Sequence, residues 1–79
     1  MQEIRTDRHW EELVKSLLKA ELKRRNVTYA QLVGKLADIG VADTEANIRN
    51  KISRGKFTAV FLVQCLHAIQ ANRLDLTDI

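Results

Sequence analysis

Hydrophobic residues recur along most of the chain at the spacing of amphipathic helices. In the first such stretch they stand at i, i+3, i+4 and i+7, which predicts a helix from about Asp7 or His9 to Arg25. Asp7 is a candidate cap for the start of this helix, and the basic residues at its other end suit the negative end of the helix dipole. Its apolar residues are Trp10, Leu13, Val14, Leu17 and Leu18.

A capping box predicts where the second helix begins. Thr28 is followed three residues later by Gln31, so the hydroxyl of one and the amide of the other can each bind the partner's backbone N–H. The helix should end near Ile39, since Gly40 can adopt the left-handed conformation that terminates helices. Gly34, inside this helix, either permits close packing or simply costs stability.

The third predicted helix is short and polar. It extends from about Asp43 to Ser53, and either Asp43 or Thr44 caps it. Its two large apolar residues, Ile48 and Ile52, lie four positions apart and therefore share the face that turns toward the core.

A fourth helix follows Gly55 and Thr58, and it is apolar almost all round. Such a helix lies at the centre of a core or packs against another chain. After it, the tail from Ala71 to Ile79 forms either a short turn of helix or an arm against the body of the protein. The apolar residues are Val60, Phe61, Val63, Cys65, Leu66 and Ile69 in the helix, and Leu74, Leu76 and Ile79 in the tail.

These elements predict an all-α fold, a compact bundle of four or five helices that contains a helix-turn-helix. The chain has no proline, three glycines and no sustained β-like alternation. Its 79 residues suffice for one domain, with a core over about residues 9–70. No apolar run approaches the ~20 residues that cross a bilayer. With a polar N-terminus and a single cysteine, we expect a cytoplasmic protein with no membrane contact.

The net charge of +3 fits a nucleic-acid partner without establishing one, and the distribution of charge is more informative. One cluster of four basic residues falls within eight positions and contains no acid. A second cluster is interrupted only by Glu21. The first consists of Arg49, Lys51, Arg54 and Lys56, and the second of Lys19, Lys23, Arg24 and Arg25.

The face of the third helix opposite Ile48 and Ile52 is small and polar, which suits the major groove of DNA. Asn pairs bidentately with adenine, Arg pairs with guanine, and Ala can touch a thymine methyl group. An ordinary solvated face would also be polar, but Asn is a poor helix former, so two of them on this face give up helix stability without a structural return. The expected base-reading residues are Ala46, Asn47, Arg49 and Asn50.

Other residues near this face suit the DNA backbone. A small cap at Thr44 lets the helix N-terminus approach a phosphate closely. Toward the other end of the helix, Lys51, Arg54 and Lys56 are well placed for phosphate contacts. The hydroxyl of Tyr29 either meets a phosphate or packs within the protein.

The stretch LKRRNVTYAQL (residues 22–32), then a helix, a turn at residues 40–41, a short polar helix and ISRGK (residues 52–56) resemble the Cro/C1 (lambda-repressor-like) helix-turn-helix family. The resemblance covers about Trp10 to Gln70. It implies a bundle of four or five helices in which the third enters the major groove. It also implies that the Thr28–Gln31 end of the second helix meets the DNA backbone, with Gln31 bridging a phosphate and a reading side chain.

Three features depart from the family pattern. The turn between the second and third helices is about three residues longer than the usual one. Ser53 replaces the glutamate that the family commonly has before its Arg-Gly turn, and Ile48 and Ile52 are four apart where the family more often shows three. The chain also resembles short bacterial proteins whose domain has no assigned function, which implies a bacterial or phage origin.

No pattern indicates catalysis, a cofactor or a metal. The two histidines stand far apart, and with one cysteine they offer no paired-ligand spacing for zinc. Cys65 lies in an apolar stretch with no identifiable base, so we interpret it as a buried small hydrophobe. We infer neither an enzyme activity nor a small-molecule ligand.

We therefore expect a sequence-specific regulator that binds double-stranded DNA, repressor-like and homodimeric, because two-fold partners roughly 34 Å apart gain affinity and specificity. The fourth helix, the tail and Trp10 are the candidate dimer surfaces. Two alternatives are an antitoxin-like adaptor that works through the same apolar surfaces, and a nucleoid protein that binds DNA without sequence preference.

Overall fold

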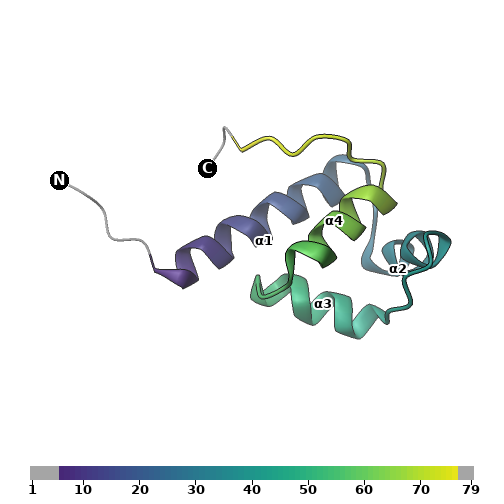
Figure 1. The fold of residues 1–79 in the computed structure, drawn as a ribbon, viewed down its shortest axis with the longest axis horizontal. Coiled ribbons are helices and arrows are strands. Elements are labelled where there is room, and N and C mark those ends of the chain that lie inside the picture. The colour runs from purple at the N-terminus through teal and green to yellow at the C-terminus, as the bar shows by residue number, and fades with distance from the viewer. Residues whose placement is uncertain (1–5, 77–79) are drawn as a thin grey trace.

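Four helices make up the part of the chain that the computed structural model describes, residues 6–76 (Figure 1). No strand occurs within these residues, so the predicted all-α bundle is confirmed. The third helix begins two residues later and ends one residue later than the sequence predicted. The helices are α1 (Asp7–Arg24), α2 (Tyr29–Asp38), α3 (Glu45–Arg54) and α4 (Ala59–Ala68).

Every helix begins after a threonine. In each case the threonine hydroxyl accepts a hydrogen bond from the backbone N–H three residues later, and such a cap contributes about 1 kcal/mol. The predicted capping box of α2 is confirmed in both directions. Asp7 does not cap α1; it lies in the first turn, where its charge favours the helix dipole. The four caps are Thr6, Thr28, Thr44 and Thr58.

A residue with positive φ follows each helix and ends it. After α1, α2 and α4 this residue belongs to a pair of hydrogen bonds that closes the last turn, such as Val41 N–H to the Leu36 carbonyl at 2.9 Å and Gly40 N–H to the Ala37 carbonyl at 3.0 Å. Only two of the four are glycines, so the others carry a left-handed conformation that the sequence did not reveal. They are Asn26, Gly40, Gly55 and Gln70.

The core lies between two crossed pairs of helices. α1 packs against α3 and α4, and α2 packs against the same two helices. Trp10, a candidate core or interface residue, is 47% exposed and lies outside the core. Buried hydrophobic residues come from all four helices and from the turn that follows α4. They are Leu18, Leu22, Leu32, Leu36, Ile48, Ile52, Phe61, Cys65, Ile69 and Ala71.

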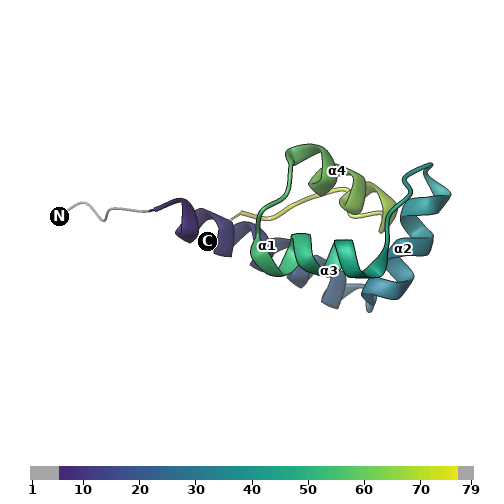
Figure 2. The same cartoon turned by 90° about the horizontal axis from the view of Figure 1, so that it is seen from below.

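The segment after α4 is an arm and not a further helix, as far as it is described. Ala71 is buried, and residues up to Leu76 run back along α1 (Figures 1 and 2). Asp75 and residues of α1 line the same surface hollow. Of the apolar tail residues predicted for the dimer contact, Leu74 is half-buried and Leu76 is exposed, while Ile79 lies outside the described residues.

Gly55 allows the turn between α3 and α4 to press directly against the backbone of α1. It has φ of 63°, and a Cβ atom added there would lie 2.2 Å from the Glu11 carbonyl oxygen. Gly34 is different, because a Cβ atom added there meets nothing within 4 Å. The close-packing interpretation of Gly34 is therefore not supported within the chain, and its cost to α2 is uncompensated there.

We expect Gly55→Ala to lower the free energy of unfolding by more than about 2 kcal/mol. The added Cβ atom would clash with the backbone of α1, and alanine would also be strained in the left-handed conformation that residue 55 adopts. The matched change Gly34→Ala should raise it by about 0.5–1 kcal/mol, since it removes a flexible residue from a helix interior. Urea denaturation followed by circular dichroism measures both. Equal stability of the two variants would contradict this assignment.

Candidate nucleic-acid interface

The outward face of α3 extends along one side of the molecule and is not covered by another helix (Figure 2). Ile48 and Ile52 are fully buried, which fixes the rotation of α3 about its axis. As a result, all four residues predicted to read bases are exposed on this helix. They are Ala46, Asn47, Arg49 and Asn50.

α2 approaches α3 near the start of α3 and lies crosswise to it (Figures 1 and 2). Residues 39–44 join the two helices, so the connection is longer than a three- to four-residue turn, as the sequence suggested. The predicted backbone contacts Thr28, Tyr29 and Gln31 lie at the first turn of α2, and Thr44 caps α3.

Arg49 joins the two helices at this end of the face. Its guanidinium carbon lies 5.8 Å from the ring centroid of Tyr29, and its Nη2 lies 3.4 Å from the carboxylate of Glu45 one turn earlier. The Arg49 side chain is 56% exposed, and ion pairs this exposed contribute little stability. Arg49 is thus loosely held beside Tyr29, and Glu45 is a neighbour that the sequence did not single out.

Gln31 has its side-chain oxygen occupied by the capping box. The Thr28 N–H donates to Gln31 Oε1 at 2.9 Å, and the Gln31 N–H donates to Thr28 Oγ1 at 3.1 Å. The amide nitrogen of Gln31 retains its two N–H groups for a partner such as a phosphate oxygen.

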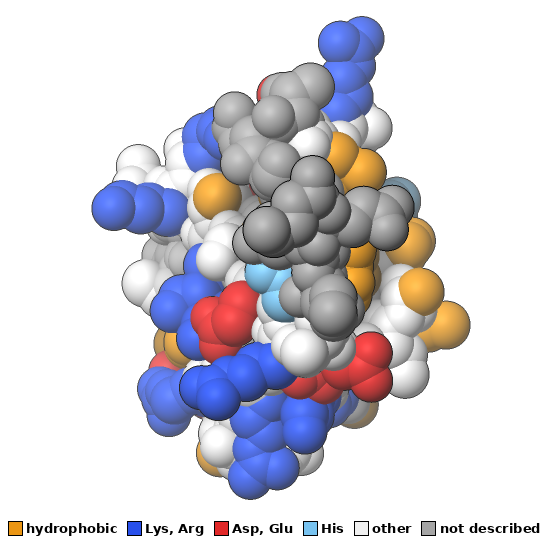
Figure 3. Space-filling view, turned by 90° about the vertical axis from the view of Figure 1, so that its left-hand side faces the viewer, with side chains coloured by type: hydrophobic (Ala, Val, Ile, Leu, Met, Phe, Trp, Pro, Cys, Tyr) orange, Lys and Arg blue, Asp and Glu red, His pale blue; other side chains and the backbone are white. Residues whose placement is uncertain are grey.

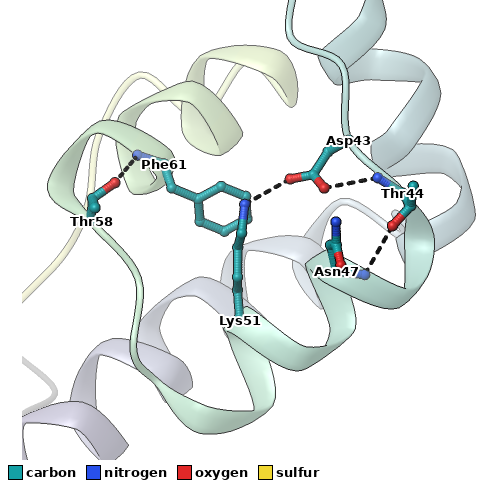
Figure 4. Close-up of polar contacts among 6 residues, drawn as sticks. All are labelled: Asp43, Thr44, Asn47, Lys51, Thr58 and Phe61. Carbon is teal, nitrogen blue, oxygen red and sulfur yellow. Dashed lines mark hydrogen bonds and ion pairs between the residues drawn. The ribbon is translucent and has the colours of Figure 1, made fainter.

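Lys51, predicted as a phosphate contact, points toward Asp43 in the turn before α3 and toward Phe61 of α4. Its Nζ donates to Asp43 Oδ2 at 2.8 Å and lies 4.6 Å from the Phe61 ring centroid (Figure 4). The other oxygen of Asp43 accepts the backbone N–H of Thr44 at 2.8 Å. Lys51 therefore ties the start of α3 to α4, and its charge is balanced within the chain.

Asp43 is the acidic centre of this small network. Its side chain is only 9% exposed. The hydrogen bond from Lys51 lowers the pKa of Asp43 below its usual 3.8, with help from the Thr44 N–H and against the effect of burial. The sequence left Asp43 and Thr44 as alternative caps of α3, and the structure shows that Thr44 is the cap. Asp43 in fact precedes the cap, where the chain turns it toward Lys51.

The two basic clusters of the sequence have different surroundings. The carboxylate of Glu21 is 5% exposed and pairs with both Arg24 and Arg25, so it holds two side chains of the second cluster while offsetting one of its four positive charges. Arg54 and Lys56 have no ion pair with any described residue and remain exposed at the end of α3. Lys and Arg side chains accordingly gather on the side of the molecule where α3 lies (Figure 3).

Cys65 is buried within the core. Burial raises the pKa of the Cys65 thiol to about 12, so the nucleophilic thiolate is suppressed. Within the same residues, no group of three or more His, Cys, Asp or Glu side chains is placed to hold a metal ion. None of the four helices described combines the length and apolar character needed to span a membrane.

Replacing Asp43 with Asn should lower the free energy of unfolding at neutral pH by about 1 kcal/mol, because a charge-assisted hydrogen bond is lost. The pKa of Asp43 is lowered by folding, so its contribution is complete above about pH 4 and disappears as pH falls through the folded-state pKa. The stability gap between wild type and Asp43→Asn should therefore close in acid. Denaturation from neutral to acidic pH measures it. Asp38→Asn, at an exposed acid of α2, is the control and should show no such loss at neutral pH.

Comparison with known proteins places most of the folded region in one family. Residues 10–74, which include all of α2, α3 and α4 and most of α1, match the family described as Domain of unknown function (DUF6471). No curated protein matches the chain, and no solved structure does. The protein therefore belongs to the DUF6471 family.

Proposed function

We propose that this protein is a sequence-specific regulator that binds double-stranded DNA through the outward face of α3. The observation that carries the proposal is the composition of that face. Ala46, Asn47 and Asn50 are exposed along it, with Arg49 beside them and exposed cations just beyond its end. A location at the nucleoid in the cytoplasm follows from this role.

The chemistry of the face matches base edges in the major groove. Asn47 and Asn50 each offer an amide that pairs with adenine N6 and N7, and Ala46 offers a methyl group to thymine. Arg49 is held only by an exposed ion pair and the Tyr29 ring, so exchange of these contacts for guanine costs little. Four neighbouring positions on one helix therefore supply three kinds of base contact.

Groups at both ends of α3 suit the DNA backbone. Near its start, Thr44 caps α3 and the ring of Tyr29 lies beside Arg49. Thr28, Tyr29 and the amide nitrogen of Gln31 belong to the first turn of α2 and its cap. At its end, Arg54 and Lys56 are exposed and lack an ion pair in the described region. We assign Lys51 a positioning role, since its ammonium already has Asp43 as its partner.

The resemblance to the Cro/C1 helix-turn-helix family supports the same function. The resemblance implies a bundle of four or five helices, and the described residues form four, with Gly55 of the ISRGK stretch in the turn after α3. The longer connection before α3 is a difference, and the Asp43–Lys51 bond compensates for it by fixing where α3 begins.

A homodimer is part of the proposal, with the exposed side of α4 as the contact. Val60 and Val63 are 66% and 63% exposed, and hydrophobic side chains are visible on the side of the molecule nearer α4 (Figure 3). α4 contains no Lys, Arg, Asp or Glu. Two copies of this positively charged chain therefore meet there without bringing like charges together. A repressor-like protein gains affinity from two reading helices on one DNA duplex.

The same valines favour a second candidate function, an adaptor of the antitoxin type that binds another protein through α4. This alternative uses α4 and leaves the face of α3 without a role. DNA binding at low salt distinguishes the two candidates, because the adaptor needs none.

Asn50→Ala should cost about 1–3 kcal/mol of binding to the preferred sequence and relax the preference at one base pair. Lys56→Ala should instead weaken binding to all sequences alike. It should also reduce the slope of log affinity against log salt concentration by about one. Selection of duplexes from a random pool, followed by titrations at several salt concentrations, measures both. Identical losses on selected and random DNA for the two variants would exclude this division of roles.

Val63→Glu should raise the dissociation constant of the dimer at least about tenfold, because it places a charge in an apolar contact. Sedimentation equilibrium measures this change. Ala37→Glu introduces the same charge on an exposed position of α2 and should leave the dimer intact. A wild-type chain that is monomeric at all concentrations would rule out the α4 dimer.

A further inference from the structure

A surface hollow lies between the first turns of α1 and the turn that ends α3. It is lined by three basic residues, two acidic residues and a serine, contributed by segments more than forty positions apart in the chain. The lining residues are Arg8, Glu11, Glu12, Ser53, Arg54 and Lys56.

The position of this hollow is fixed by the backbone. Gly55 sits against the Glu11 carbonyl so closely that no side chain fits between them. The start of α1 is therefore held directly beside the end of α3, as the ribbon shows (Figure 1). Arg8, which has no place in the sequence-based interface, is thereby brought to the same site as Arg54 and Lys56.

The charges of the hollow leave a net excess of cation. Arg8, Arg54 and Lys56 have no ion pair with a described residue, and all three are exposed. Glu12 is engaged with Lys15, at 3.5 Å, on the side of α1. Three cations beside two acids, one of which is partly neutralised, attract an anion at short range.

A helix in the major groove has a phosphate backbone on each side of it. The first turn of α2 lies near the start of α3, and the hollow lies at the opposite end of α3. The two sites are thus placed to meet the two strands that border the groove.

We propose that this hollow binds a backbone phosphodiester of DNA, and that Arg8 of α1 is a phosphate-binding residue together with Arg54 and Lys56. This inference rests on the proposed DNA-binding function. It extends the interface from the helix-turn-helix to α1 and gives the DNA backbone a second anchor. Glu11 and Glu12 both oppose the contact, and Glu12 is the more exposed of the two, so its charge limits the affinity of the hollow for an anion.

The test compares three charge changes in the full chain: Arg8→Gln, Glu12→Gln and the control Arg73→Gln. Arg73 is an exposed cation in the arm after α4. The ribbon of this arm runs on the side of the molecule away from α3 (Figure 1). The probe is a labelled random-sequence duplex about three helical turns long, or the sequence selected from the pool. Binding is titrated from low to moderate salt, and thermal melting confirms that each variant is folded.

Arg8→Gln should weaken binding and reduce the slope of log affinity against log salt by about one. The advantage of wild type over Arg8→Gln should therefore shrink about three- to fourfold between about 50 and about 200 mM salt. Glu12→Gln should strengthen binding, and Arg73→Gln should match wild type in slope.

The outcomes separate the inference from the function on which it rests. If wild type binds no duplex at low salt, both are overturned. If wild type binds but Arg8→Gln and Glu12→Gln keep its affinity and slope, the DNA-binding function stands and the phosphate site is overturned. A loss of slope in Arg73→Gln equal to that in Arg8→Gln also overturns it, because the effect is then one of net charge.

Discussion

The contact between Gly55 and the backbone of α1 is the constraint on which the rest of the arrangement depends. No residue with a side chain fits between the α3–α4 turn and the Glu11 carbonyl. This contact sets where α3 ends and brings the first turns of α1 beside it. With Ile48 and Ile52 fully buried on the inner side, the helix has only one face left to present outward. The candidate interface is thus a consequence of how α3 is anchored.

The start of α3 is anchored by polar contacts instead of close packing. Lys51 reaches back to Asp43 at 2.8 Å, and Thr44 caps the first turn. These bonds contribute about 1 kcal/mol each to the free energy of unfolding. This is less than the loss of more than about 2 kcal/mol that we expect when a side chain is added at Gly55. Both ends of the ten-residue helix are nevertheless defined, which an exposed helix of this length requires because it is marginal on its own. A helix with fixed ends presents its side chains in a constant register, as the proposed function requires of α3.

Sequence patterns predicted the helices well because their signals are local. Thr28 and Gln31 form the expected capping box, and Gly40 follows α2 in the expected left-handed conformation. Asn26 and Gln70 were not anticipated as helix ends, since their conformation is imposed by the hydrogen bonds that close the turn. The contact of Lys51 with Asp43 and the proposed role of Arg8 were also beyond sequence reasoning, because each depends on residues from other elements. Glu21 is a third example, because its burial and its ion pairs with both Arg24 and Arg25 could not be read from the sequence.

The reactivity of Cys65 reports how often the core of this protein opens. The thiol is fully buried between the helices, and its raised pKa keeps it protonated while the core is closed. A thiol reagent therefore reacts only with molecules whose core has opened, and when closing is fast the rate of labelling is proportional to their population. Any ligand that binds only the folded form reduces that population, whichever surface it occupies. The rate at which one sulfur atom is modified thus measures ligand binding without a label on the ligand and without knowledge of its site.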